Sequence, residues 1–283
     1  FGVAAFYFVF LHALYVRRFL IITCRLQASH RYIFKKKPSL IMSSSEIVRV
    51  ASYAPSAREV ILVAGFPGSG LVGSIAVNYL TDKFGFTYLG CVSSPLLTST
   101  SAAVNGLARP SVRLYEKGNI VALVSDVPIP DEAAYEIPLA VIDWILERAR
   151  ITEIAVIGGV VTGGEGERVF GAATTPRVLE RIKSVAEILP ALNITGITGG
   201  ILNEAAFRNI PAYGLLIETN FDVDPRASAA GLSAFAALYG LTIDTEDLIK
   251  QADTVEPMLQ QLADEVKNSD MTPITYEGDI MFG

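Results

Sequence analysis

The chain has 283 residues, of which 51% are hydrophobic, so it is long and apolar enough for one α/β domain with appendages. Residues 1–41 contain seven Lys and Arg but no Asp or Glu, which leaves 16 basic residues against 29 acids and a formal charge of −13 for residues 42–283. This acidic body repels nucleic-acid phosphates and anionic membrane surfaces, so we expect no nucleic-acid partner and disfavour a membrane.

Histidine and cysteine restrict the chemistry further. Both histidines, His12 and His30, lie in the first 41 residues, as does Cys24, one of the two cysteines. The rest of the chain has no imidazole, which argues against a Ser-His-Asp or Cys-His nucleophile and against zinc held by histidine. Cys91 stands in an apolar run and is expected to be a buried core thiol. We therefore predict a protein that is not an enzyme and uses neither a cofactor nor a metal.

Residues 1–41 are predicted to lie outside the folded domain. Residues 1–16 are almost wholly apolar and precede Arg17-Arg18, but this stretch is shorter than the roughly 20 residues that cross a bilayer. It also lacks the charged leading region of a signal peptide. Met42 opens an ordinary polar sequence where the charge balance changes. We prefer upstream sequence translated in error, and the alternative is an N-terminal anchor.

From residue 60 onward, short apolar runs alternate with amphipathic stretches, which is typical of strands that cross over through helices. The first run, Val60–Ala64, predicts a strand that enters a glycine-rich turn, and a helix follows at residues 71–83. The next predicted strands are residues 87–92, 112–115 and 120–125. The residues Glu116-Lys117-Gly118-Asn119 predict a hairpin turn between the last two of these strands.

The second half of the chain predicts the centre of the sheet. Asp131 is expected to cap a helix in which Trp144 lies on the buried face. Three apolar runs are predicted to be central parallel strands, at residues 154–160, 194–201 and 212–217. Two helices follow at about 226–239 and 245–267, and residues 269–283 are predicted to be a flexible tail. The predicted fold is thus a three-layer α/β/α domain over residues 42–268, with a mostly parallel central sheet.

Three glycine-rich segments follow predicted strands or lie close to one. They are residues 65–73, residues 158–167, and residues 198–200 near Asn203. Because the carboxyl ends of parallel strands meet at one edge of a sheet, we expect these loops to share a crevice with the segment around Asp224. The residues predicted to line the crevice are Gly65, Gly68, Gly70, Gly159, Gly163, Gly164, Asn203, Asp222 and Asp224.

Each part of this crevice has a chemical and a structural interpretation. Backbone N–H groups of the first loop could hold a small anion. That loop lacks the Lys-Ser/Thr pair of a P-loop and the dinucleotide fingerprint, so a tight structural turn is preferred. Asp222 and Asp224 could hold a divalent cation or serve as acid and base. We prefer the interpretation that one of them begins or caps the next helix.

Four segments in order resemble the proteasome assembly chaperone 2 (PAC2) family. They are GFPGSGLVG at 65–73, IGG at 157–159, TGITGGILNEA at 195–205 and DVDPRASAA at 222–230. Over roughly residues 60–267 the chain is similar to archaeal homologues that were once grouped with ATP-grasp-like enzymes. The resemblance implies a cytoplasmic α/β/α domain that forms homo-oligomers and assists proteasome assembly by binding the α-subunits of the core particle.

The resemblance also implies a function for the C-terminal tail. Archaeal members can end in a hydrophobic residue, a tyrosine and any residue, and this tail inserts between neighbouring α-subunits. Here the last residues are Met281, Phe282 and Gly283, with Phe in place of Tyr. The phenol hydrogen bond would be lost, whereas burial of the ring, worth roughly 1.5–3 kcal/mol, would remain. The alternative is an ordinary frayed terminus.

A second candidate function follows from the older grouping of the archaeal homologues. The glycine loops would then belong to an enzyme that binds a nucleotide or a small anion. Such a site needs lysines for the phosphates and several acids for magnesium, and the glycine loops of this chain have no such set nearby. The binding protein is therefore the preferred hypothesis.

Overall fold

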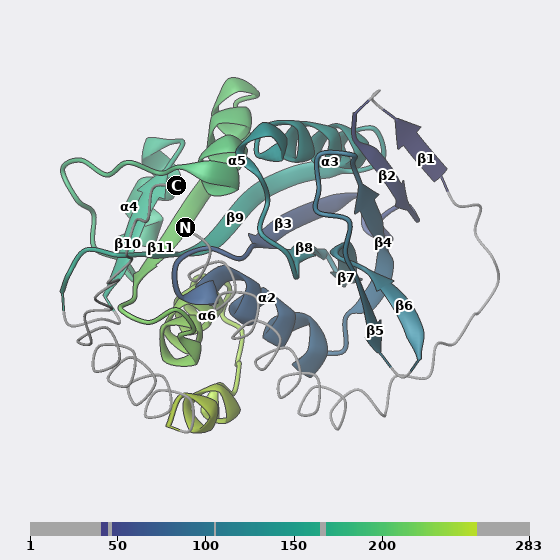
Figure 1. Cartoon of the computed structure of the whole chain (residues 1–283). Helices are drawn as coiled ribbons and strands as arrows, with labels where there is room; N and C mark the ends of the chain where they lie inside the picture. The colour runs from purple at the N-terminus through teal and green to yellow at the C-terminus, as the bar shows by residue number, and fades with distance from the viewer. Residues whose placement is uncertain (1–40, 45–46, 105, 165–167, 254–283) are drawn as a thin grey trace, which may run out of the picture.

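The computed structural model describes residues 41–44, 47–104, 106–164 and 168–253. Over these residues, nine strands form one mixed sheet in the order β1-β2-β4-β7-β8-β3-β9-β11-β10 (Figure 1). The bounds are β1 Ile41–Ser44, β2 Arg49–Ser52, β3 Glu59–Gly65, β4 Thr87–Ser93, β7 Val112–Lys117, β8 Ile120–Ser125, β9 Arg150–Val160, β10 Val169–Ala173 and β11 Ala212–Glu218. A separate two-stranded hairpin consists of β5 (Ser101–Val104) and β6 (Leu107–Pro110).

The centre of the large sheet is parallel, as the sequence predicts. β8, β3, β9 and β11 are neighbours and all run in the same direction. The pairs on either side, from β1 to β8 and between β11 and β10, are antiparallel. All seven residues of β11 are buried. A strand with both faces covered needs apolar residues at nearly every position, which is why the apolar run in the sequence predicted it.

Helices cover both faces of the sheet (Figure 1). They are α2 (Val72–Lys83), α3 (Glu136–Leu146), α4 (Pro176–Ile182), α5 (Gly196–Phe207) and α6 (Pro225–Tyr239). In β9, Ile154 and Val156 join the apolar cluster under α3 and α5, whereas Ala155 and Ile157 join the cluster under α2, α4 and α6. Two separate cores on the two sides of one sheet confirm the predicted three-layer α/β/α fold.

The predicted strand at residues 194–201 is wrong, because α5 begins at Gly196 and occupies the rest of this segment. Ile197, Ile201 and Ala205 recur every four residues and face the cluster shared with α3, which is helical spacing. Gly200 permits the close contact: a Cβ placed there would lie 2.2 Å from the carbonyl oxygen of Ala134. β11 therefore pairs directly with β9, and residues 194–201 contribute no strand between them.

Three smaller predictions differ from the structure or extend beyond it. Asp131 begins a short 3-10 helix (Asp131–Ala133) that follows Pro130 and has no side-chain cap, so it does not cap α3. Cys91, on β4, is half-buried rather than fully buried. The predicted last helix is described only over residues 246–253, and its remainder lies outside the described residues.

Other local predictions are confirmed. Trp144 is fully buried in the core between the sheet and α3. The hairpin between β7 and β8 turns at Gly118, whose φ is +58°. The helix predicted at about 226–239 is α6, and Gly240 ends it with a left-handed φ of +62°.

Candidate functional site

Three loops meet at the carboxyl edge of the central strands, where the sequence predicts a crevice. The backbone N–H of Asp224 donates to the carbonyl oxygen of Gly70 at 2.8 Å, which joins the loop after β11 to the loop after β3. The amide of Asn220 donates to the carbonyl oxygen of Gly164 at 2.7 Å and so reaches the loop after β9. Asn203 does not belong to these loops, since it is exposed on α5.

At the central glycines of this arrangement, backbone atoms of the chain itself occupy the space where a side chain would lie. A Cβ at Gly65 would lie 2.0 Å from the carbonyl oxygen of Gly73, and one at Gly73 would lie 2.2 Å from that of Ile157. At Gly159 a Cβ would lie 2.0 Å from the carbonyl oxygen of Ser69. These glycines let three backbone segments approach one another closely. The packing agrees with the structural turn that the sequence analysis prefers over an anion cradle.

The rim of the crevice is less crowded. A Cβ added at Gly68 or Gly163 would meet no atom within 4 Å, although Gly163 has a φ of +78°. At Gly164, a Cβ would lie 2.4 Å from Oε1 of Glu218, a fully buried residue at the end of β11. That this rim holds a ligand stays a prediction.

Asp224 caps α6, which confirms the structural interpretation of this residue. Its Oδ1 accepts a hydrogen bond from the backbone N–H of Ala227 at 2.8 Å, and its Oδ2 accepts one from the hydroxyl of Thr219 at 2.7 Å. Only 5% of Asp224 is exposed, whereas Asp222 is exposed. In the described part of the chain, no three His, Cys, Asp or Glu side chains are grouped so that they could hold a metal ion.

We expect Asp224→Ala to lower the free energy of unfolding by about 2 kcal/mol, the upper end of the range for loss of an N-cap. The loss should be large because the hydroxyl of Thr219 would also lose its acceptor in a buried site. Urea unfolding measures the difference. Asp222→Ala, at an exposed position two residues away, should change stability by less than about 0.5 kcal/mol. Equal losses in the two variants would contradict the capping assignment.

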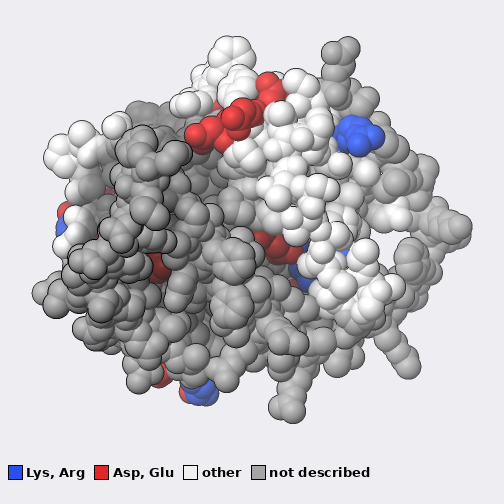
Figure 2. Space-filling view, viewed as in Figure 1, with Lys and Arg blue, Asp and Glu red and all other residues white. Residues whose placement is uncertain are grey.

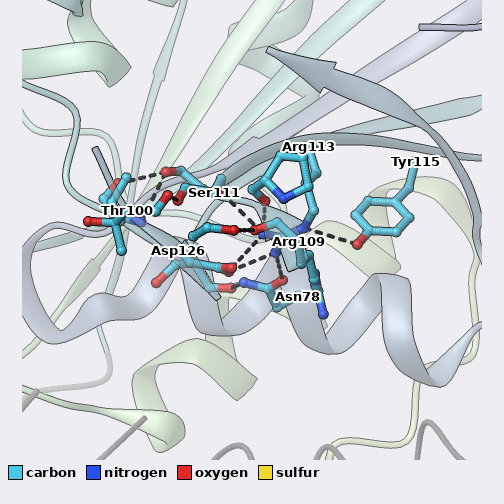
Figure 3. Close-up of polar contacts among 12 residues, drawn as sticks. Asn78, Thr100, Arg109, Ser111, Arg113, Tyr115 and Asp126 are labelled. Carbon is cyan, nitrogen blue, oxygen red and sulfur yellow. Dashed lines mark hydrogen bonds and ion pairs between the residues drawn. The ribbon is translucent and has the colours of Figure 1, made fainter. Parts of the chain in front are cut away.

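A second polar cluster surrounds Arg113, a residue that sequence reasoning missed. Arg113 lies on β7 and is 0% exposed (Figure 3). Its Nη2 lies 2.7 Å from Oδ1 of Asp126 and 3.2 Å from Oδ1 of Asn78, and its Nη1 also pairs with Asp126. Its Nε donates to the hydroxyl of Tyr115 at 3.0 Å. Burial by itself lowers the pKa of this guanidinium, but the hydrogen bonds and charge of Asp126 outweigh it and the pKa is raised.

The Arg113 cluster joins four parts of the fold. Asn78 comes from α2, and Asp126 follows β8. The Nη1 of Arg113 also donates to the carbonyl oxygens of Pro110 and Ser111, at 2.8 and 3.3 Å, where the β5–β6 hairpin returns to the sheet. The cluster contains one buried positive charge with its donors satisfied and offers no open position to a substrate. We therefore assign it to positioning the hairpin.

The C-terminal residues Met281, Phe282 and Gly283 lie outside the described residues, as do residues 1–40. Among the helices that are described, none combines the length and the apolar character needed to span a bilayer.

Comparison with known proteins identifies the family of the chain. A family model described as the PAC2 family matches residues 62–263. Over 206 residues, covering 72% of this chain and 86% of the relative, the sequence is 28% identical to an uncharacterized protein of Methanocaldococcus jannaschii.

Solved structures from Pyrococcus furiosus have the same fold. PbaA, described as an archaeal homolog of proteasome-assembly chaperone, matches with a TM-score of 0.69 and 27% identity over 80% of this chain and 95% of PbaA. PbaB, described as an archaeal proteasome activator, matches with a TM-score of 0.69 and 24% identity over 77% of this chain and 100% of PbaB. With the family match over residues 62–263, these findings show that the chain belongs to the PAC2 family.

Proposed function

We propose that this chain is a cytoplasmic proteasome assembly chaperone or proteasome-binding adaptor, which acts by contact with α-subunits of the core particle and catalyses no reaction. The observation that carries the proposal is the match to PbaA, an archaeal homolog of proteasome-assembly chaperone, over 95% of that chain at 27% identity. Two observations give further support, since neither favours a catalytic centre. Residues 42–283 contain no histidine, and the central glycines of the loops are packed closely against backbone.

In this proposal a homo-oligomeric body presents several copies of the C-terminal tail. The ring of Phe282 is buried between neighbouring α-subunits, and the carboxylate of Gly283 pairs with a lysine of the partner. Several tails on one body raise the effective concentration of each after the first has bound. A weak contact by each tail then suffices for tight binding.

We expect Phe282→Ala to weaken binding to α-rings by about 10- to 100-fold per tail, the factor that corresponds to loss of one buried aromatic ring. The measurement is a titration of purified α-rings of the host core particle with the full chain. Tyr276→Ala removes an aromatic ring from the tail outside its last three residues and should leave binding unchanged.

The outcomes distinguish a failure of tail docking from a failure of the proposed function. Unchanged binding after Phe282→Ala would contradict docking through the tail. A wild-type chain that does not bind α-rings at any accessible concentration would contradict the proposed function itself.

A further inference from the structure

The β5–β6 hairpin forms a surface that is almost free of charge in an acidic protein. Residues 93–112 contain one charged residue, Arg109, whereas 18% of the whole chain is charged. We call the exposed part of residues 101–104 and 106–110 the hairpin surface. In Figure 2 the region over β5 and β6 is largely white, so Lys, Arg, Asp and Glu are sparse on this side of the hairpin.

The hairpin surface has little cover from the rest of the described structure. Strand β5 pairs only with β6 within the described residues, which leaves its other edge without a strand partner. Side chains on both strands are exposed or half-buried, and Leu107 is 64% exposed. An isolated two-stranded hairpin is marginally stable in water, and an open strand edge is a template for pairing with another chain.

The base of the hairpin is nevertheless held firmly. Arg113 donates to the carbonyl oxygens of Pro110 and Ser111, and the hydroxyl of Ser111 donates to the carbonyl oxygen of Thr100 at 2.7 Å (Figure 3). Both ends of the hairpin are therefore fixed to the body through the Arg113 cluster. A surface that is ordered before binding loses less conformational entropy in a complex.

Charge favours a second copy of the same chain as the occupant. Residues 42–283 have a formal charge of −13, so these parts of two copies repel one another over most of their surfaces, and a surface with little charge lets them meet at little electrostatic cost. Phe207 on α5 is more exposed, at 83%, but its neighbour Arg208 is paired with Asp143 and Glu204. Contact between copies at Phe207 would bring these charged groups close to a second acidic body.

We propose that the hairpin surface is the contact between copies of this chain, which gives a location to the self-association assumed in the proposed function. Leu107 lies at the start of β6 beside the turn and is the largest exposed apolar side chain of this hairpin. Leu107 is therefore the anchor of the contact.

Sedimentation velocity on the full chain tests this proposal. Leu107→Asp should raise the dissociation constant of the oligomer by more than about 100-fold, because a carboxylate would enter a contact between two acidic bodies. Val161→Asp is the matched control, since Val161 is 66% exposed against 64% for Leu107 and lies outside the hairpin. This control should remain assembled. The thermal unfolding of both variants should match wild type because both side chains are exposed.

Three results would overturn the proposal: a monomeric wild-type chain, an oligomer that persists in Leu107→Asp, or an equal loss of assembly in Val161→Asp. Salt gives an independent readout. If the contact itself is uncharged and the bodies repel, raising the ionic strength should strengthen association. Weaker association at high salt would show a contact held by ion pairs and would also overturn the proposal.

The experiment also separates this inference from the proposed function. Phe282→Ala should lose α-ring binding yet sediment as wild-type oligomer. An oligomer that depends on Leu107 but binds no α-ring would leave the hairpin contact standing while the proposed function fails. Tail-dependent binding to α-rings by a monomeric chain would support the proposed function and contradict the hairpin contact.

Discussion

Arg113→Met is expected to lower the free energy of unfolding by about 3 kcal/mol, as measured by urea denaturation. The guanidinium is fully buried, and its removal leaves Asp126, the carbonyl oxygens of Pro110 and Ser111 and the Oδ1 of Asn78 without this donor. Breaking a buried ion pair from one side typically costs about 3–5 kcal/mol, and partial exposure of Asp126 places this case at the lower end.

An exposed ion pair provides the control for Arg113. Arg150 pairs with Glu59 at 2.6 Å, but the two side chains are 68% and 61% exposed, so Arg150→Met should cost less than about 1 kcal/mol. Hydrogen exchange should also show faster exchange of the hairpin amides in Arg113→Met than in Arg150→Met. Equal stability losses, or unchanged exchange in residues 101–110, would contradict the assignment of Arg113 to positioning the hairpin.

The centre of the fold is predictable from sequence because its strands are buried on both faces. β3, β9 and β11 each contain a run of apolar residues, and such runs differ clearly from the loops around them. The hairpin strands β5 and β6 are short, contain three alanines among eight residues, and are largely exposed, so they lack the pattern that identifies a strand. β10 is likewise five residues long and contains Gly171.

Residues 194–201 show where local pattern fails. Three isoleucines and two threonines among three glycines favour a strand by composition, yet most of the segment is helical. Its environment decides the structure, because Gly199 and Gly200 lie tightly against the carbonyl oxygens of Ile194 and Ala134. The contact with Ala134 joins residues 66 positions apart, so no local window contains it.

The two candidate sites differ in predictability for a similar reason. The rule that loops meet at the carboxyl edge of parallel strands correctly brings together the segments around Gly70, Gly164 and Asp224. The rule does not tell at which glycines backbone atoms occupy the space of a side chain. Arg113 could not be predicted at all, because arginine is rarely fully buried and its partner Asp126 has no distinguishing sequence pattern.

Gly159→Ala is expected to cost about 3 kcal/mol of stability, which is large for a single added methyl group. The new Cβ would lie 2.0 Å from the carbonyl oxygen and 2.9 Å from the carbonyl carbon of Ser69. Neither side can move by a rotamer change, since both contacts are made by backbone at the junction of β9 and the loop after β3. Overpacking of this kind usually costs about 1–3 kcal/mol and occasionally more.

Gly68→Ala is the matched control, because it lies in the same glycine loop and an added Cβ would meet no atom within 4 Å. Its φ of −161° is extended backbone that alanine also adopts, so stability should change by less than about 0.5 kcal/mol. If Gly68→Ala were as damaging as Gly159→Ala, the loop would be constrained by something other than contact within the chain. A large loss only in Gly159→Ala would instead show that the glycines act by letting three backbone segments meet, whether or not the open rim holds a ligand.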